Sequence, residues 1–187
     1  MNLKKIEKLV REFLKEIGEN PRRPGLIDTP HRVAEMCQEI FAGLKKNPGK
    51  VLKVIHAEKH DEMVLLRDIP FHSICEHHLL PVLGKVHIAY IPAGDRVTGL
   101  SKLARLVDII SKRPQLQERM TKQVADNIMK ILRPAGAGVI IEARHLCIEM
   151  RGIRKPEARA VTSAVRGRFR QDVRTREEFL QLVKGNF

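Results

Sequence analysis

Four reactive side chains stand in consecutive positions in the segment SICEHHLL: Cys75, Glu76, His77 and His78. Apolar residues flank the group on both sides. Cys75 and His78 are three positions apart, so in a tight turn both side chains face one point, whereas His77 is directed elsewhere. A thiolate and an imidazole that converge in this way are typical zinc ligands, but two ligands do not complete a zinc site.

A second pair of the same residue types, His145 and Cys147, occurs in the segment RHLC, far along the chain. We expect a strand over residues 138–150, and residues two apart in a strand point to the same face. Cys147 is therefore the natural third ligand beside Cys75 and His78. Three protein ligands with an open fourth position are typical of a catalytic metal, and thiolates with an imidazole favour Zn²⁺.

His77 and His145 would remain beside such a metal as unliganded imidazoles. Because imidazoles titrate near neutrality, they suit general acid and general base catalysis, and the group resembles a hydrolytic centre. The alternative is that Cys75 and Cys147 are ordinary buried thiols and that the adjacent histidines lie at the surface. The presence of both Cys–His pairs favours the metal.

The remaining cysteine and histidines show no ligand spacing. Cys37 lies on the apolar stripe of an expected helix, where a cysteine acts as a small core residue. The other histidines are interpreted as surface or satisfied polar residues: His31, His56, His60, His72 and His87.

The segment VTGLSKLAR is a candidate anion site. A helix expected to begin at Ser101 would present free backbone N–H groups, with Lys102 and Arg105 three apart on one face. An ordinary solvated helix end is the alternative. The chain has no GxxxxGK[ST] loop, no GxGxxG after a strand and no HxE with PCxxC, so P-loop, Rossmann and zinc-deaminase sites are not indicated.

Composition limits the class of protein. The 187 residues are 43% hydrophobic, which is enough for one sizeable core, and the net charge of +13 indicates an anionic partner. One Tyr, six Phe and no Trp do not favour a stacking platform for single-stranded nucleic acid, so a small polyphosphate remains a candidate. No apolar run approaches ~20 residues and charges begin near the N-terminus, so we expect a cytoplasmic protein.

The elements that must position these residues follow from periodicity. Thr29 with Pro30, Ser101, and Thr175 with Glu178 are interpreted as helix starts. Helices are expected over 6–17, 29–44, 101–110, 116–131 and from 175, and strands over 62–73, 84–92, 138–150 and 159–165. This order predicts an α+β protein with an antiparallel sheet, divided into an N-terminal helical segment, 1–60, and a catalytic domain, 61–187.

Four motifs in this order, CEHH, GLSKLAR, RPQLQER and HLCIEMRGI, resemble those of the GTP cyclohydrolase I family. The similarity runs from NPRRPGLIDTPHRV to TREEFL. It implies a tunnelling fold, with a helix pair packed on one face of the sheet, and a homodecamer of two pentamers with active sites at subunit contacts. It also implies zinc-dependent hydrolytic opening of the guanine imidazole ring of GTP, which releases formate and forms 7,8-dihydroneopterin triphosphate, the first step of tetrahydrofolate and pteridine biosynthesis.

The resemblance also implies roles for individual residues. Zinc would be held by Cys75, His78 and Cys147, and the catalytic imidazoles would be His77 and His145. The guanine would be bound by Gln117 and Glu118. The triphosphate would be bound by Ser101, Lys102, Arg105 and Arg151, with Arg32 from another subunit. The family often has a lysine where this chain has Glu35, which puts that one phosphate contact in doubt.

Two other classes stay open at this point. A basic, zinc-stabilised nucleic-acid-binding module would explain the charge, and a closed site with four ligands would favour it. A non-hydrolytic tunnelling-fold enzyme acting on a purine or pterin would explain the fold. Relatives that reduce nitriles use a cysteine without the Cys-His-Cys set, so CEHH with HLC argues against them. The expected partner is GTP, with no nucleic acid and no membrane.

Overall fold

The computed structural model describes residues 1–185, in a chain that divides into two compact units, Met1–Ala42 and Gly43–Phe187. The division comes earlier than the boundary at residue 60 that composition suggests. Leu52 is buried in the main core of the second unit, and the Gly43 N–H donates to the carbonyl of Lys112. The segment that follows Ala42 therefore packs as part of the larger unit.

The first unit consists of helices α1 (Leu3–Glu16) and α2 (Thr29–Ile40), which contact each other. The Asn2 side chain caps α1 by accepting a hydrogen bond from a backbone N–H of the first turn. Leu14 and Ala34 are the buried apolar residues of the two helices. Both helices agree with the apolar periodicity, although α2 ends before the expected Leu44.

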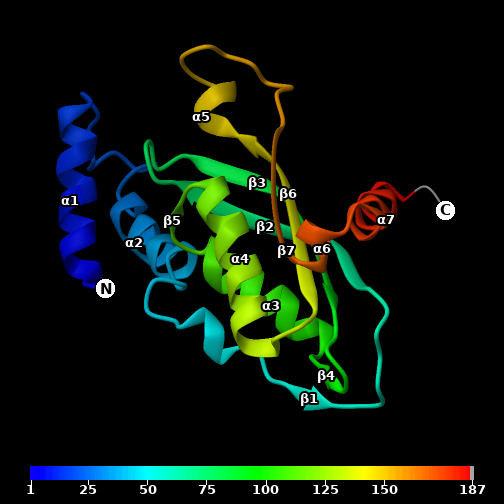
Figure 1. The fold of residues 1–187 in the computed structure, drawn as a ribbon. Coiled ribbons are helices and arrows are strands. Elements are labelled where there is room, and N and C mark those ends of the chain that lie inside the picture. The colour runs from blue at the N-terminus through cyan, green and yellow to red at the C-terminus, as the bar shows by residue number, and fades with distance from the viewer. Residues whose placement is uncertain (186–187) are drawn as a thin grey trace. The chain divides into compact units, whose positions relative to one another are not determined.

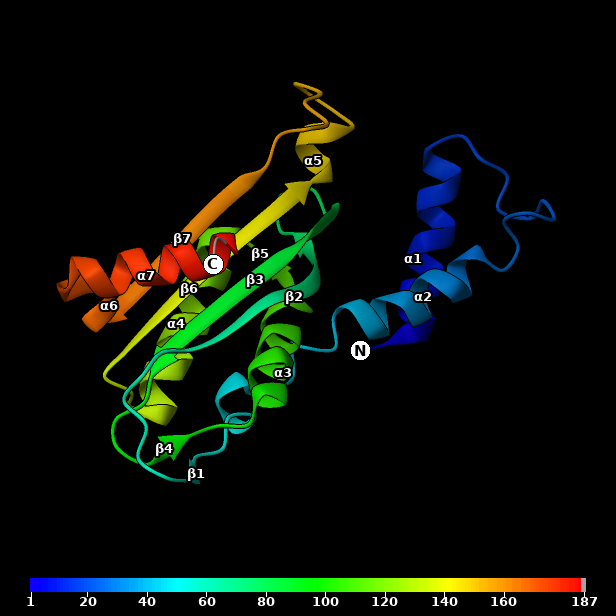
Figure 2. The ribbon, with the colours of Figure 1, turned by 90° about the vertical axis from the view of Figure 1, so that its right-hand side faces the viewer.

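The second unit is built on a five-stranded sheet in the order β5-β2-β3-β6-β7. All neighbouring strands are antiparallel except β2 and β5, which pair in parallel. Figure 2 shows the long strands lying side by side. The bounds are Val64–Cys75 for β2, Pro81–Ile91 for β3, Pro114–Gln115 for β5, Gly136–His145 for β6 and Ala160–Gly167 for β7.

Smaller elements lie beyond the end of the sheet where β3 finishes. A 3-10 turn, η1 (Pro48–Lys50), precedes a two-stranded ladder of β1 (Ile55–His56) and β4 (Arg96–Val97). The guanidinium of Arg96 donates to main-chain carbonyls in the last turn of the helix that ends at Leu132. The β1–β4 ladder therefore marks the end of the second unit opposite the reactive segment at Cys75.

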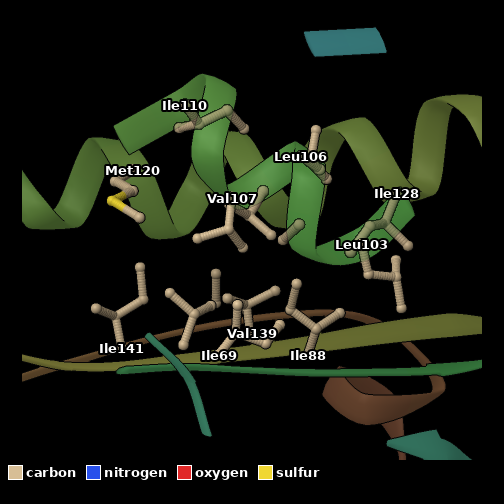
Figure 3. Close-up of a cluster of buried hydrophobic side chains, with 14 of the residues drawn as sticks. Ile69, Ile88, Leu103, Leu106, Val107, Ile110, Met120, Ile128, Val139 and Ile141 are labelled. Carbon is tan, nitrogen blue, oxygen red and sulfur yellow. The ribbon is translucent and has the colours of Figure 1, made fainter. Parts of the chain in front are cut away.

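Helices α3 (Leu100–Ser111) and α4 (Gln117–Leu132) lie side by side against one face of the sheet (Figure 1). Apolar residues at helical spacing on both helices meet alternate residues of the strands, and each buried Leu or Ile contributes about 1.5–3 kcal/mol. Figure 3 shows this core, in which Leu103, Leu106, Val107, Ile110, Met120 and Ile128 face Ile69, Ile88, Val139 and Ile141.

The other face of the sheet carries a smaller cluster. Helices α6 (Arg168–Gln171) and α7 (Val173–Lys184) place Phe169 and Phe179 against Ala89, Ile91 and Ile140 of the sheet. Figure 2 shows α7 in front of the strands and α4 behind them. None of the helices in residues 1–185 is both long and apolar enough to cross a membrane.

The predicted fold class is confirmed: an α+β chain with an antiparallel sheet and a helix pair packed on one face, the arrangement implied under the name tunnelling fold. The predicted strand over 138–150 is wrong beyond His145, where helix α5 (Leu146–Glu149) begins. Continuing the β3–β6 register would set Leu146 opposite Pro81, the first residue of β3, and proline has no N–H to donate to the ladder. The backbone turns instead, and the Met150 N–H donates to the Leu146 carbonyl.

Three predicted helix starts are shifted. The N-cap residues of α2 and α3 are Asp28 and Gly99. Thr29 and Ser101 follow them and lie within the first turns of these helices. Helix α7 begins at Val173 because the Asp172 carboxylate accepts hydrogen bonds from the N–H of the second helical residue and from the hydroxyl of Thr175. These shifts leave the faces of the helices unchanged.

Candidate active site and metal centre

The CEHH segment forms the connection between β2 and β3, as its position in the sequence predicts. The Cys75 N–H donates to the Leu80 carbonyl, and the Leu79 N–H donates back to the Cys75 carbonyl, each at 2.9 Å. Leu79 has a φ of +53°, a left-handed conformation that costs an ordinary residue about 1–2 kcal/mol. The turn buries Cys75 and leaves His77 and His78 exposed.

Helix α5 brings the third predicted metal ligand to this turn. Within the part of the chain that the structure describes, the donor atoms of Cys75, His78 and Cys147 lie within 4.8 Å of one another. The Cys75 Sγ atom is 3.9 Å from Nδ1 of His78. The pairing of Val82 with His145 in the β3–β6 ladder brings the three ligands together. The CEHH turn lies directly before β3, and helix α5, which carries Cys147, lies directly after β6.

The thiol of Cys147 is perturbed by its surroundings. Burial raises the pKa of Cys147, and the hydrogen bond and charge of Cys75 raise it further. A pair of neighbouring thiols can lose protons together only when a cation compensates the negative charge. The cluster therefore has the donor types and the spacing of a site for a soft divalent metal ion.

His145 lies at the end of β6, partly buried, and its Nε2 atom is 2.7 Å from Oε1 of Gln117. Burial lowers the pKa of the imidazole below its ordinary value of 6.5, against the opposing charges of Glu118 and Glu149. The ring is therefore neutral at pH 7. Its sequence position, two residues before Cys147, places it at the edge of the candidate metal cluster.

Gln117 begins helix α4 and is only 6% exposed. Its Nε2 atom is 3.0 Å from the carbonyl oxygens of Ile141 and Ala160 and 3.1 Å from Oγ1 of Thr162. The amide group of this residue therefore joins α4 to β6 and β7. The contact with guanine that the sequence suggests for Gln117 is not supported by these bonds, because its NH₂ group is engaged within the chain.

Two further predicted residues lie around the cluster. Arg151 is 2.8 Å from Nε2 of His78, so the guanidinium donates a hydrogen bond to that nitrogen. The rings of His77 and His78 meet edge to face, with their centroids 6.2 Å apart. The structure therefore gathers Arg151 and both histidines of the turn at one place.

Glu118 follows Gln117 in the first turn of α4 but is exposed. Its side chain lines a cleft of about 420 Å³ between α4 and β7, together with Thr121, Thr162 and Arg166. A carboxylate in the first turn of a helix is favoured by the helix dipole. The cleft opens beside the start of α4, the end of this helix that lies near the metal cluster. At that place the Glu118 carboxylate would accept hydrogen bonds from the N–H groups of a ligand.

The predicted phosphate residues on α3 are not brought to the cluster. Ser101, Lys102 and Arg105 lie in the first two turns of this helix, whereas its other end leads to β5, which pairs with Cys75. A helix of 12 residues is about 18 Å long. Among residues 1–185, neither Lys102 nor Arg105 has an ion pair or side-chain hydrogen bond.

Arg32 belongs to the first unit, on helix α2, and its guanidinium is 3.4 Å from the carboxylate of Asp28. Glu35, where the family often has a lysine, lies 3.4 Å from Nε2 of His31. The second ring nitrogen of His31 contacts Glu7 at 3.0 Å. Arg32 and Glu35 both make these contacts within the first unit.

Two ion pairs beside the cluster were not recognised from the sequence. The Arg119 guanidinium binds both carboxylate oxygens of Glu76, and the Arg144 guanidinium binds both oxygens of Glu149 at 2.8 and 2.6 Å. One pair ties the CEHH turn to α4, and the other ties β6 to α5. The Glu76 partner is 43 residues away, so no local spacing could have indicated the pair.

Comparisons with known proteins give similarities over nearly the whole chain. Residues 6–184 match a family model described as GTP cyclohydrolase I. The chain is 59% identical over 181 residues to GTP cyclohydrolase 1 of Pelotomaculum thermopropionicum, with 97% of this chain and 96% of the relative covered. Proteins of the same name from Clostridioides difficile (58% identity, 96% and 95% covered) and Bacillus subtilis (54%, 98% and 97%) are also similar.

Solved structures give more distant similarities. An archaeosine synthase QueF-Like protein in the apo form has a TM-score of 0.44 and 16% identity, covering 56% of this chain and 93% of that one. A dihydroneopterin aldolase from a Burkholderia species, bound to guanine, has a TM-score of 0.38 and 14% identity, covering 57% and 91%.

Proposed function

Since the chain belongs to the GTP cyclohydrolase I family, we propose that it opens the guanine imidazole ring of GTP by zinc-dependent hydrolysis. The products are formate and 7,8-dihydroneopterin triphosphate, and the reaction is the first step of tetrahydrofolate and pteridine biosynthesis in the cytoplasm. The observation that carries the proposal is the Cys75, His78 and Cys147 cluster, with His145 at its edge. Residues 61–187 form the catalytic domain in this proposal.

The three clustered side chains fit zinc by their chemistry. Two thiolates and one imidazole are preferred ligands of this ion, and tetrahedral bonds of about 2.0–2.3 Å place ligands roughly 3.5 Å apart, close to the present spacing. Three protein ligands leave a fourth position open. A zinc ion bound there supplies a Lewis acid and an activated water molecule.

Two imidazoles supply the proton transfers. His145 is neutral at pH 7, and its Nε2–H donates to Gln117, so Nδ1 is the free acceptor nitrogen of the ring. His77 is exposed. In this assignment one imidazole accepts a proton and the other protonates the guanine ring nitrogen that leaves when the ring opens.

The substrate is held at both ends. The Glu118 carboxylate accepts hydrogen bonds from the paired N–H donors of the guanine edge, in the cleft between α4 and β7. The triphosphate binds Ser101, Lys102, Arg105 and Arg151, with Arg32 supplied by another chain. The phosphates act as a handle and do not react, so the absence of a P-loop motif is consistent with this chemistry.

The distance between the α3 cations and the metal cluster supports an oligomer. Lys102 and Arg105 lie at the end of α3 that is remote from Cys75, so these two residues of one chain would complete the site of a neighbour, whose own Arg151 lies at the cluster. Within the described residues, β7 has a strand partner on one side only, which leaves a sheet edge open to another subunit. We propose a homodecamer of two pentamers with active sites at the subunit contacts.

The test is direct. Purified protein is incubated with GTP, formate is measured, and the product is oxidised and detected as a fluorescent pterin, while zinc is measured by elemental analysis. We expect one formate per pterin and about one zinc per chain. GTP consumption with release of phosphate alone, or no consumption by zinc-loaded oligomer, would contradict the proposed function.

A further inference from the structure

We propose that Gln117 is a positioning residue that holds the imidazole of His145 in one tautomer and one orientation, and that it is not a ligand of guanine. The inference rests on the proposed function, because it assigns Gln117 a role in the same reaction. It replaces the contact suggested by the RPQLQER motif. The observations that carry it are the burial of Gln117 and the direction of each of its hydrogen bonds.

The orientation of the Gln117 amide is determined by its partners. Main-chain carbonyls accept hydrogen bonds and never donate them, and two of them, those of Ile141 and Ala160, lie 3.0 Å from one end of the amide. The NH₂ group must occupy that end. An exchange of the two amide atoms would place oxygen against two carbonyl oxygens. The Oε1 atom therefore faces His145, at 2.7 Å.

This orientation determines the tautomer of His145. An amide oxygen only accepts, so the hydrogen bond requires a proton on Nε2 of the ring. In the neutral imidazole the other nitrogen, Nδ1, is then unprotonated and free to accept. A protonated Nδ1 with a bare Nε2 would set two acceptors 2.7 Å apart, so that tautomer is strongly disfavoured.

A ring of hydroxyl groups supports the same arrangement. The Thr121 hydroxyl donates to the main-chain carbonyl of Gln117 at 2.7 Å, so at its 2.7 Å contact with Thr162 it must accept. The Thr162 hydroxyl therefore donates to Thr121 and accepts from the Gln117 amide at 3.1 Å. The NH₂ group has two hydrogens for three acceptors, so one hydrogen is shared, and all three contacts still require nitrogen and not oxygen at this end of the amide.

Space around the pair is restricted. Gln117 is 6% exposed, so a ligand in the cleft beside Glu118 has almost no access to its side chain. Beside the imidazole, an enclosed cavity of about 10 Å³ is the size of a single water molecule. It is lined by Phe71, Ser73, Val82, Gln115, Gln117, Met120 and His145.

The decisive variant is Gln117→Met, which keeps the length of the side chain and removes both the acceptor and the donors. We expect kcat to fall about 10–100-fold, as for other groups that orient a functional histidine, with KM and Kd for GTP and the zinc content unchanged. In a His145→Ala background the same change should alter kcat by less than about twofold, because its effect passes through the imidazole. A guanine ligand would instead raise Kd in both backgrounds, and that result would overturn the proposal.

The matched control is Gln115→Met. Gln115 is also buried, and its amide donates to the Ile110 carbonyl and to Gln123, with no hydrogen bond to His145 among the described residues. This variant should lose stability but keep kcat. An equal loss of kcat in both variants would show a general effect of removing a buried amide and would refute a specific role for Gln117.

A measurement on the unmodified protein does not depend on whether the variants fold. Nitrogen NMR of histidine-labelled, zinc-loaded oligomer, with the His145→Ala spectrum used for assignment, should show His145 with Nε2 protonated and Nδ1 bare. The opposite tautomer would overturn the inference. If the protein fails to hydrolyse GTP but shows the expected tautomer, the proposed function fails while the positioning of His145 stands.

Discussion

At the end of the α3–α4 pair where α4 begins, Gln117 and two bidentate ion pairs hold the reactive side chains by bonds within one chain. At the other end, Lys102 and Arg105 are unpaired within residues 1–185 and project from an exposed helix start. Proton transfer requires heavy atoms within about 2.6–3.2 Å, whereas attraction between charges declines only gradually with distance. The chain fixes the groups that need exact placement, and it leaves long-range attraction to cations that have no partner among residues 1–185.

The largest effect is expected at the end of the helix pair that holds the metal cluster. Cys147→Ala should reduce zinc from about one per chain to near zero and lower kcat on the order of 10³-fold or more, since a catalytic metal contributes several kcal/mol. Elemental analysis and the formate assay measure both effects. Cys37→Ala is the control, because Cys37 lies on α2 of the first unit and is not one of the clustered residues. Full zinc content and normal turnover in Cys147→Ala would remove this ligand from the site.

The second largest effect is the loss of kcat expected when the exposed imidazole of His77 is removed. His77→Ala should lower kcat about 10²–10⁴-fold, the usual contribution of a general acid or base, with zinc and GTP binding retained. His72→Ala, an exposed histidine on β2, serves as the control and should keep its activity. Single-turnover kinetics with GTP measure the chemical step. An unchanged rate in His77→Ala would exclude this residue from proton transfer.

At the other end of the helix pair the effect should be on binding. Lys102→Ala and Arg105→Ala should each raise KM for GTP about tenfold and leave kcat nearly unchanged, because each removes a charge that binds the phosphates and does not take part in the reaction. Lys130→Ala, an exposed lysine in the last turn of α4, is the charge-matched control. A fall in kcat at constant KM would show that the α3 residues act on the chemistry.

Mixed oligomers sharpen the contrast between the two ends. A His77→Ala chain keeps its phosphate residues, and a Lys102→Ala/Arg105→Ala chain keeps its cluster. If each site takes its two halves from different chains, equal mixing should restore roughly a quarter of the sites at low GTP. If one chain supplies both halves, mixing will restore none, and the proposed subunit contact will be wrong.

The smallest effect concerns the ion pair that ties the CEHH turn to α4. The hydrogen bond from Arg119 lowers the pKa of Glu76 below its ordinary value of 4.5. The folded pKa is thus below the unfolded one, so this contribution to stability is present above pH 4.5 and is lost as pH falls through the folded value. Glu76→Gln should lower the Tm of zinc-free protein slightly at pH 7 and by less at pH 3. An equal shift at both pH values would exclude the charge as the cause.

The sequence predicts the metal cluster better than it predicts the local structure that builds it. The sequence pattern places Cys147 in a strand, whereas in the structure it lies in helix α5. Its thiol is nevertheless within 4.8 Å of the ligand atoms of Cys75 and His78, as predicted. The spacing of His145 and Cys147 keeps both residues close to the end of β6 in either conformation. The apolar pattern of residues 138–150 does not show where the neighbouring strand begins. That strand, β3, begins at Pro81, and the β3–β6 ladder ends there.

Two other features depend on contacts between distant segments. The PQLQER segment has the pattern of a polar helix start, and the burial of Gln117 becomes apparent only when β6 and β7 present their carbonyls to it. Likewise, the parallel pairing of β5 with β2 decides which end of α3 lies near Cys75. Periodicity predicts that a helix exists and which face it buries, but not its direction relative to a reactive turn.

The register of β3 and β6 also governs when the cluster forms during folding. His78 and Arg151 are 73 residues apart, and closing so long a loop is unfavourable until the central strands have paired. Contacts that form after the transition state slow unfolding and leave the folding rate almost unchanged. A ligand bound at the cluster therefore extends the lifetime of the native chain without guiding its collapse.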